Sequence, residues 1–175
     1  MNVIFLDYDG VLDTVHKSGD IDIENRIKIL SNICNLYDAK IVISASLKTS
    51  IDEETLAPLN VKVKKLFELF NKYNIRVIGR TKEIEKKYKH AIISTWKEDE
   101  IIDYLNQHPE IEHFCIIDDD EGYTINSDLN KVRNHLVMPI GFSNNPDEEG
   151  LLEKHIIEVG NILKLDNEYK ISNAR

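Results

Sequence analysis

The sequence lacks any apolar run long enough to cross a membrane, and its N-terminus lacks the basic flank of a signal peptide. It is also poor in cysteine: Cys34 and Cys115 are the two in 175 residues, and each has apolar neighbours. This pattern favours buried free thiols over a disulfide or a cysteine-ligated metal. We therefore expect a cytoplasmic protein without disulfides.

Positive charge is scarce as well. The chain has 22 Lys and Arg against 31 Asp and Glu, which gives a formal net charge of −9. General nucleic-acid binding depends on phosphate neutralisation by Lys and Arg, so this balance argues against it. A phosphorylated substrate is not excluded, but it needs a local basic group because a net-negative surface repels it at long range.

Internal repeats, low-complexity tracts and interdomain linkers are also absent from the sequence, and its length suits one domain with a sizeable core. We expect a single domain over residues 1–165 and a polar, frayed tail over residues 166–175. Short apolar segments predict strands at residues 3–6, 40–43, 75–78, 113–117 and 136–138. Amphipathic segments predict helices after Asp22, after Asn60, and at residues 98–107, 124–134 and 148–165.

This alternation of strands and helices predicts an α/β fold, with a doubly wound, mostly parallel five-stranded sheet. Ligands of such folds bind outside the carboxyl ends of the strands. Three of the expected strands end in polar groups at that edge: Asp7 with Asp9, Ser44, and Asp118 with Asp119. Their coincidence predicts a functional site.

The first of these groups carries the most information. Asp7 and Asp9 follow a buried strand, stand two residues apart and precede Gly10. Strand geometry puts both carboxylates on one side of the backbone, where they repel each other. The pair is therefore expected to hold a cation or to share a proton.

Taken together, these motifs resemble those of the haloacid dehalogenase-like (HAD) hydrolase superfamily, from Val3 to about Leu152. The first motif, Asp7-Tyr-Asp9-Gly10-Val11, is the most specific of them when it closes an N-terminal strand. The later part of the chain is similar to the cap-free branch related to polynucleotide-end phosphatases and RNA-repair proteins. The segments that carry this second similarity are Lys97-Glu-Asp-Glu-Ile101, Tyr104-Leu-Asn-Gln-His-Pro109 and the Leu136-Val-Met … Gly150-Leu pattern.

The resemblance implies a Rossmann-like core and a phosphatase that hydrolyses phosphate monoesters through an aspartyl-phosphate. Asp7 would be the nucleophile, and Asp9 the general acid and then the general base. Ser44 would donate a hydrogen bond to a phosphoryl oxygen, and Lys97 would balance the charge of Asp7 and of the phosphoryl group. Gly10 and Lys48 are the expected substrate contacts.

A magnesium ion is implied as well, because a carboxylate cannot approach an anionic phosphoryl group without charge neutralisation. Its expected ligands are Asp7, the backbone carbonyl of Asp9, Asp118 and Asp119. Oxygen ligands without a His or Cys cluster favour magnesium over zinc.

Two of these assignments have rivals. Ser46 competes with Ser44 as the phosphate ligand, and Arg80 competes with Lys97 because Arg80-Thr-Lys-Glu-Ile84 has a similar spacing. The basic segment 80–90 is interpreted as a solvated helical face.

Residues 13–40 and 49–96 leave no room for a large cap, so the site is expected to be open. An open site suits a large or exposed substrate: a phosphoprotein, a nucleic-acid end or a small phosphate ester. Two other functions stay open. A phosphotransferase or phosphomutase would use the same residues, and a non-catalytic phospho-dependent switch or binding domain would use the same fold.

Overall fold

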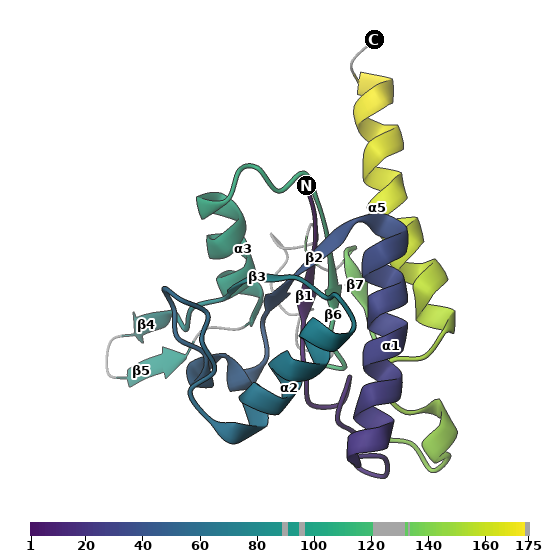
Figure 1. The fold of residues 1–175 in the computed structure, drawn as a ribbon. Coiled ribbons are helices and arrows are strands. Elements are labelled where there is room, and N and C mark those ends of the chain that lie inside the picture. Colours follow the sequence, from purple (N-terminus) through teal and green to yellow (C-terminus); the bar gives the residue numbers. More distant parts are fainter. Residues whose placement is uncertain (89–90, 95–96, 121–131, 133, 174–175) are drawn as a thin grey trace.

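A computed structural model describes residues 1–88, 91–94, 97–120, 132 and 134–173 of the chain (Figure 1). Its centre is a five-stranded sheet in the order β3-β2-β1-β6-β7, and every neighbouring pair is parallel. The strands are β1 (Asn2–Leu6), β2 (Ala39–Ile43), β3 (Val77–Arg80), β6 (His113–Ile117) and β7 (Leu136–Val137). The predicted parallel α/β fold is confirmed.

Helices cover both faces of this sheet. They are α1 (Asp20–Tyr37), α2 (Val61–Lys72), α3 (Lys97–Gln107) and α5 (Lys154–Asn173). Side chains alternate along β1, so Ile4 and Leu6 join the core shared with α1, α2 and α5. Val3 and Phe5 point to the opposite face and pack in the core that contains Ile101 of α3. Each face thus has its own buried layer, as a doubly wound sheet requires.

The helix ends differ in how well the sequence predicts them. The helix predicted after Asn60 is confirmed as α2, and Asn60 caps it, because its Oδ1 accepts a hydrogen bond of 2.9 Å from the backbone N–H of Val63. The last helix begins at Lys154 rather than at residue 148, and it continues to Asn173. Its start is delayed because Gly150 adopts a φ of 74° and the next N–H bonds to the carbonyl of Val11.

Residues 80–88, the described part of the basic segment, are not helical, so that interpretation was wrong. Residues Glu85–Tyr88 (β4) and Ala91–Ser94 (β5) pair instead as a two-stranded antiparallel sheet. Figure 1 shows this hairpin at the left, apart from the main sheet. The β-branched and aromatic residues in these strands favour pairing over helix formation. The helix expected at residues 124–134 lies almost entirely outside the described residues.

The carboxyl edge of the sheet is open. In the part of the chain that the structure describes, no separate cap domain stands over this edge, as expected. Both cysteines are free and buried, also as expected. None of the described helices is long and apolar enough to cross a membrane.

Candidate active site

Strands β1, β2 and β6 end in the same register, which brings three polar residues to one edge of the sheet. These are Asp7, Ser44 and Asp118, each the first residue beyond its strand. The N–H of Asp7 donates to the carbonyl of Ile117 at 2.9 Å, and that of Ser44 donates to the carbonyl of Leu6 at 3.0 Å. The backbone pairing therefore sets the positions of these residues, as the sequence predicted.

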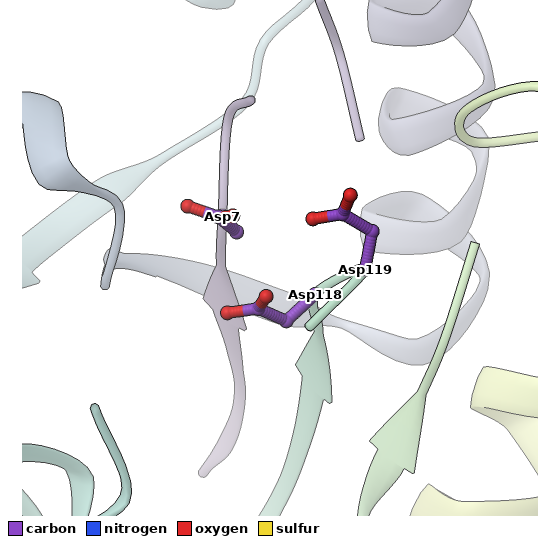
Figure 2. Close-up of side chains that lie close together, drawn as sticks. All are labelled: Asp7, Asp118 and Asp119. Atoms are coloured by element: carbon purple, nitrogen blue, oxygen red, sulfur yellow. The ribbon is translucent and has the colours of Figure 1, made fainter. Parts of the chain in front are cut away.

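Asp7, Asp118 and Asp119 form a cluster of carboxylates. Each offers one oxygen, and these oxygens all lie within 4.8 Å of one another. Figure 2 shows Asp7 beyond the end of β1 and the other two carboxylates beyond the end of β6. Asp7 and Asp118 are buried, and Asp119 is half-buried. Three hard oxygen donors at this spacing fit a divalent cation such as Mg²⁺.

Lys97 supplies the positive charge at this cluster. It is the first residue of α3, and its Nζ lies 3.0 Å from Oδ2 of Asp7 and 2.8 Å from Oδ2 of Asp118. The rival residue, Arg80, points elsewhere: its guanidinium donates to the carbonyl of Thr81 and lies 3.5 Å from Glu53. The geometry favours Lys97 over Arg80 as the site cation.

The charges of the cluster shift one another's pKa. Burial, followed by repulsion from Asp118, raises the pKa of Asp7 to about 6, although Lys97 opposes the rise. Burial and Asp118 also raise the pKa of Asp119. Burial lowers the pKa of Lys97, but the attraction of the two carboxylates outweighs it and leaves a net rise. Protein groups alone thus leave the carboxylates under-compensated, and a divalent ion would supply the missing charge.

Two glycines hold Asp119 between them. A side-chain carbon at Gly10 or at Gly141 would collide with the carboxylate of Asp119. Gly10 also has a φ of 75°, a conformation that other residues rarely adopt. The close backbone approach fixes Asp119 beside the turn that follows β1. Gly10 was expected to contact substrate, and it does line the cleft.

Asp9 lies at the mouth of the site, outside the carboxylate cluster. Its carboxylate accepts a hydrogen bond of 3.3 Å from Oγ of Ser46, and Nζ of Lys62 lies 3.9 Å away. The side chain is 64% exposed, so it can meet a substrate that enters from solvent. Its backbone carbonyl as a metal ligand stays a prediction.

The two serines differ in their surroundings. Ser46 lines the cleft and is engaged with Asp9. Ser44 is fully buried, and its Oγ has no hydrogen-bond partner among the described residues. A buried hydroxyl in that state is unusual in a folded protein, and a ligand oxygen would satisfy it.

The structure does not bring Lys48 to the site, contrary to the expectation that it contacts substrate. The short helix η1 (Ser46–Ser50) turns Lys48 inward, where its Nζ lies 2.7 Å from Oε2 of Glu100. Oγ1 of Thr81 donates to the same oxygen at 3.0 Å. Lys48 and Glu100 are both buried, so each charge depends on the other.

Asp7, Lys97 and Asp119 line an open cleft of about 780 Å³. Its described lining combines most of the predicted residues with several others, namely Asp7, Asp9, Gly10, Asp13, Thr14, Val15, Ser46, Lys97, Asp119, Asp120, Gly141 and Phe142. Asp13 and Asp120, which the sequence analysis did not assign to the site, also line this cleft. The wall is therefore strongly acidic around one lysine.

Sequence reasoning missed the contribution of the loop after β7. Gly141 and Phe142 reach the cleft from that loop. Glu149 anchors it, because its buried carboxylate accepts the N–H groups of Ser143 at 2.9 Å and of His16 at 3.2 Å. The sequence offered only a weak signal here, a glycine followed by an aromatic residue shortly after an apolar segment.

Comparison with known families agrees with this geometry. Residues 3–142 match the model of a family described as the HAD domain in Swiss Army Knife RNA repair proteins. A search of curated proteins found no match, and neither did a search of solved structures. The matched segment includes both aspartate motifs, Ser44 and Lys97, and it spans most of the 175 residues. The chain therefore belongs to the HAD superfamily, in the family of HAD domains of Swiss Army Knife RNA repair proteins.

Proposed function

We propose that this HAD-type hydrolase is a magnesium-dependent phosphatase that transfers a phosphoryl group to Asp7 and then to water. The observation that carries the proposal is the placement of Lys97 between Asp7 and Asp118, beside Asp119. A nucleophilic carboxylate, a fixed cation and a set of metal ligands meet at one strand edge. Phosphoryl transfer needs this combination, because its catalysis rests mainly on positioning and charge stabilisation.

Asp7, Asp118 and Asp119 would hold the ion, because their oxygens have the chemistry and the spacing for it. When bound, Mg²⁺ neutralises charge on the phosphoryl oxygens and on the carboxylates. Lys97 adds a second positive charge, 3.0 Å from Oδ2 of Asp7. Both charges lower the repulsion that an anionic substrate meets at this acidic cleft.

In the first half of the reaction, a carboxylate oxygen of Asp7 attacks phosphorus and the bond from phosphorus to the leaving oxygen breaks. Protonated Asp9 gives its proton to that leaving oxygen. Ser46 positions Asp9 through their hydrogen bond of 3.3 Å. Asp7 then carries the phosphoryl group as an acyl phosphate.

In the second half, Asp9 acts as a base. It takes a proton from a water molecule, the water oxygen attacks phosphorus, and the bond between phosphorus and Asp7 breaks. Inorganic phosphate leaves and Asp7 is restored as a carboxylate. Asp9 suits both tasks because its side chain is exposed at the mouth of the cleft, where leaving group and water pass.

A phosphorylated nucleic-acid end is the substrate that best fits the observations. The family is described by its occurrence in RNA repair proteins. The open cleft admits the end of a polymer, which would itself cover the reacting atoms. The net charge of −9 disfavours long contacts along a phosphate backbone and is compatible with recognition of the terminus alone.

The test is a release assay for inorganic phosphate, with 3′- and 5′-phosphorylated oligonucleotides, nucleotides and phosphopeptides as substrates. We expect magnesium-dependent turnover of at least one oligonucleotide, abolished by EDTA and by Asp7→Asn. Wild-type turnover that survives both treatments would contradict the proposal. Transfer to an added alcohol in place of water would identify a phosphotransferase.

The two serines can be separated in the same assay. We assign Ser44 to the phosphoryl group, because its hydroxyl has no partner among the described residues whereas that of Ser46 is engaged with Asp9. Ser44→Ala should raise the KM for substrate and the inhibition constant of inorganic phosphate. Ser46→Ala should instead lower kcat and alter its pH profile, through Asp9. The opposite pattern would reverse the assignment.

A further inference from the structure

The cleft has an apolar side as well as an acidic one. Among the residues described, its large exposed apolar side chains are Val15, 68% exposed, and Phe142, 62% exposed. Neither takes part in the phosphoryl chemistry proposed above. Exposed apolar groups at the mouth of a polar cleft indicate contact with an apolar part of a ligand.

Phe142 is held as part of a built platform. Its ring stacks on the ring of His16, with centroids 5.4 Å apart and planes inclined by 29°. Nδ1 of His16 lies 2.6 Å from Oε1 of Glu149. The same buried carboxylate accepts the N–H of Ser143, the residue after Phe142. Glu149 thus fixes the positions of both His16 and Phe142.

The platform is also tied to the reacting centre. Gly141 packs against the carboxylate of Asp119 and directly precedes Phe142. The N–H of Gly150 donates to the carbonyl of Ile140 at 2.8 Å, which anchors the loop from its other side. The position of the Phe142 ring relative to Asp119 is therefore set by a few short, fixed contacts.

We propose that Phe142, backed by His16, stacks on the nucleobase next to the phosphate of a nucleic-acid end. The inference rests on the phosphatase function proposed above, and it names the part of the substrate that this site recognises. Bases of any sequence stack on aromatic side chains, so this contact suits a domain that acts on ends. A nucleotide carries its base and its phosphate on one sugar, and the exposed ring of Phe142 lines the same cleft as the buried Asp7.

Binding can be measured apart from catalysis. In the Asp7→Asn background, phosphorylated oligonucleotides with 2-aminopurine as the terminal base are titrated with protein, and quenching of the base fluorescence reports stacking. We expect quenching by the parent protein, its loss in Phe142→Ala and its recovery in Phe142→Trp. Leu36→Ala removes an equally exposed apolar side chain from α1 that is not among the residues lining the cleft, and should change nothing.

A second arm uses turnover by protein with Asp7 intact. Phe142→Ala should raise the KM at least about tenfold for an end that carries a base, and leave the KM for an abasic end unchanged. The stacking role of Phe142 would be wrong if Phe142→Ala raised the KM equally for both kinds of end, or if it left the quenching unchanged. It would also be wrong if Phe142→Ala impaired turnover of phosphotyrosine peptides but not of nucleotides. If no phosphate ester is hydrolysed, the phosphatase proposal fails, while quenching still tests stacking.

Discussion

Nζ of Lys48 lies 2.7 Å from Oε2 of Glu100 in the interior of the protein. Lys48 belongs to the turn after β2, and Glu100 lies three residues after Lys97 in the first turns of α3. The pair therefore joins the edge that carries Ser44 to the helix that carries the site cation. We interpret both as positioning residues for Lys97.

Glu100→Ala should destabilise the protein, because it leaves the ammonium of Lys48 buried without its partner. We expect the free energy of unfolding to fall by about 3–5 kcal/mol in urea titrations. Glu24→Ala breaks an ion pair of similar length, Lys72–Glu24 at 2.6 Å, on the surface. It should cost much less than Glu100→Ala, because water screens this surface pair. An equal cost for both variants would contradict the structural role of the buried pair.

Lys97→Met should lower kcat for phosphate release by about 10²–10³-fold, because it removes a fixed charge from the reacting centre. Arg80→Met is the matched control, since Arg80 has the rival sequence spacing but pairs with Glu53. It should retain kcat close to that of the wild type. A greater loss of kcat in Arg80→Met than in Lys97→Met would show that Arg80, not Lys97, supplies the positive charge of the site.

Gly141→Ala should weaken Mg²⁺ binding, because the added carbon displaces the carboxylate of Asp119. Gly10→Ala should do the same and also lower stability by about 1 kcal/mol, since its φ is positive. Isothermal titration with Mg²⁺ measures the first effect and urea unfolding the second. Gly19→Ala is the control, because the new carbon would meet only ordinary van der Waals contact. Unchanged Mg²⁺ affinity in Gly141→Ala would contradict the inference that Gly141 fixes the position of the Asp119 carboxylate.

The raised pKa of Asp7 makes stability depend on pH when the ion is removed. The pKa rises from 3.8 to about 6 on folding, so the folded state binds this proton more tightly than the unfolded state. Stability from this group is full below pH 3.8 and falls as pH rises through 6, by on the order of 3 kcal/mol. Asp7→Asn lacks this loss, because its side chain does not ionise.

Urea titrations in EDTA between pH 4 and pH 7 test this dependence. The stability of Asp7→Asn relative to wild type should increase up to about pH 6 and then level off. Saturating Mg²⁺ should reduce the difference at pH 7, since the ion favours the charged carboxylates of the wild type. A difference that stays constant over the whole range would rule out the pKa shift.

Sequence patterns predicted those parts of the molecule that follow from local periodicity. Strands β1 and β6 have apolar runs that end in aspartates, so the carboxyl ends of both strands and the aspartates that follow them could be predicted directly. Parallel pairing then brought Asp7 and Asp118 together, because their strands end in register. The helix after Asn60 was predicted for the same local reason, the spacing of its apolar residues.

The features that escaped prediction depend on tertiary contacts. Lys48 was predicted to contact substrate, and its actual buried partner, Glu100, could not be recognised because it is 52 residues away in sequence. The hairpin β4–β5 carries charges at spacings that also suit a helix. Gly141 and Phe142 gain their place through Asp119 and Glu149, and no short motif records such long-range packing.

The order of the strands also has a consequence for synthesis of the chain. β1 leaves the ribosome first, yet in the finished sheet it lies between β2 and the much later β6. One edge of β1 therefore stays unpaired until about 110 further residues have been translated. The carboxylates of Asp7, Asp118 and Asp119 cannot come together before β6 has been translated, so any activity that needs all three begins only after that point.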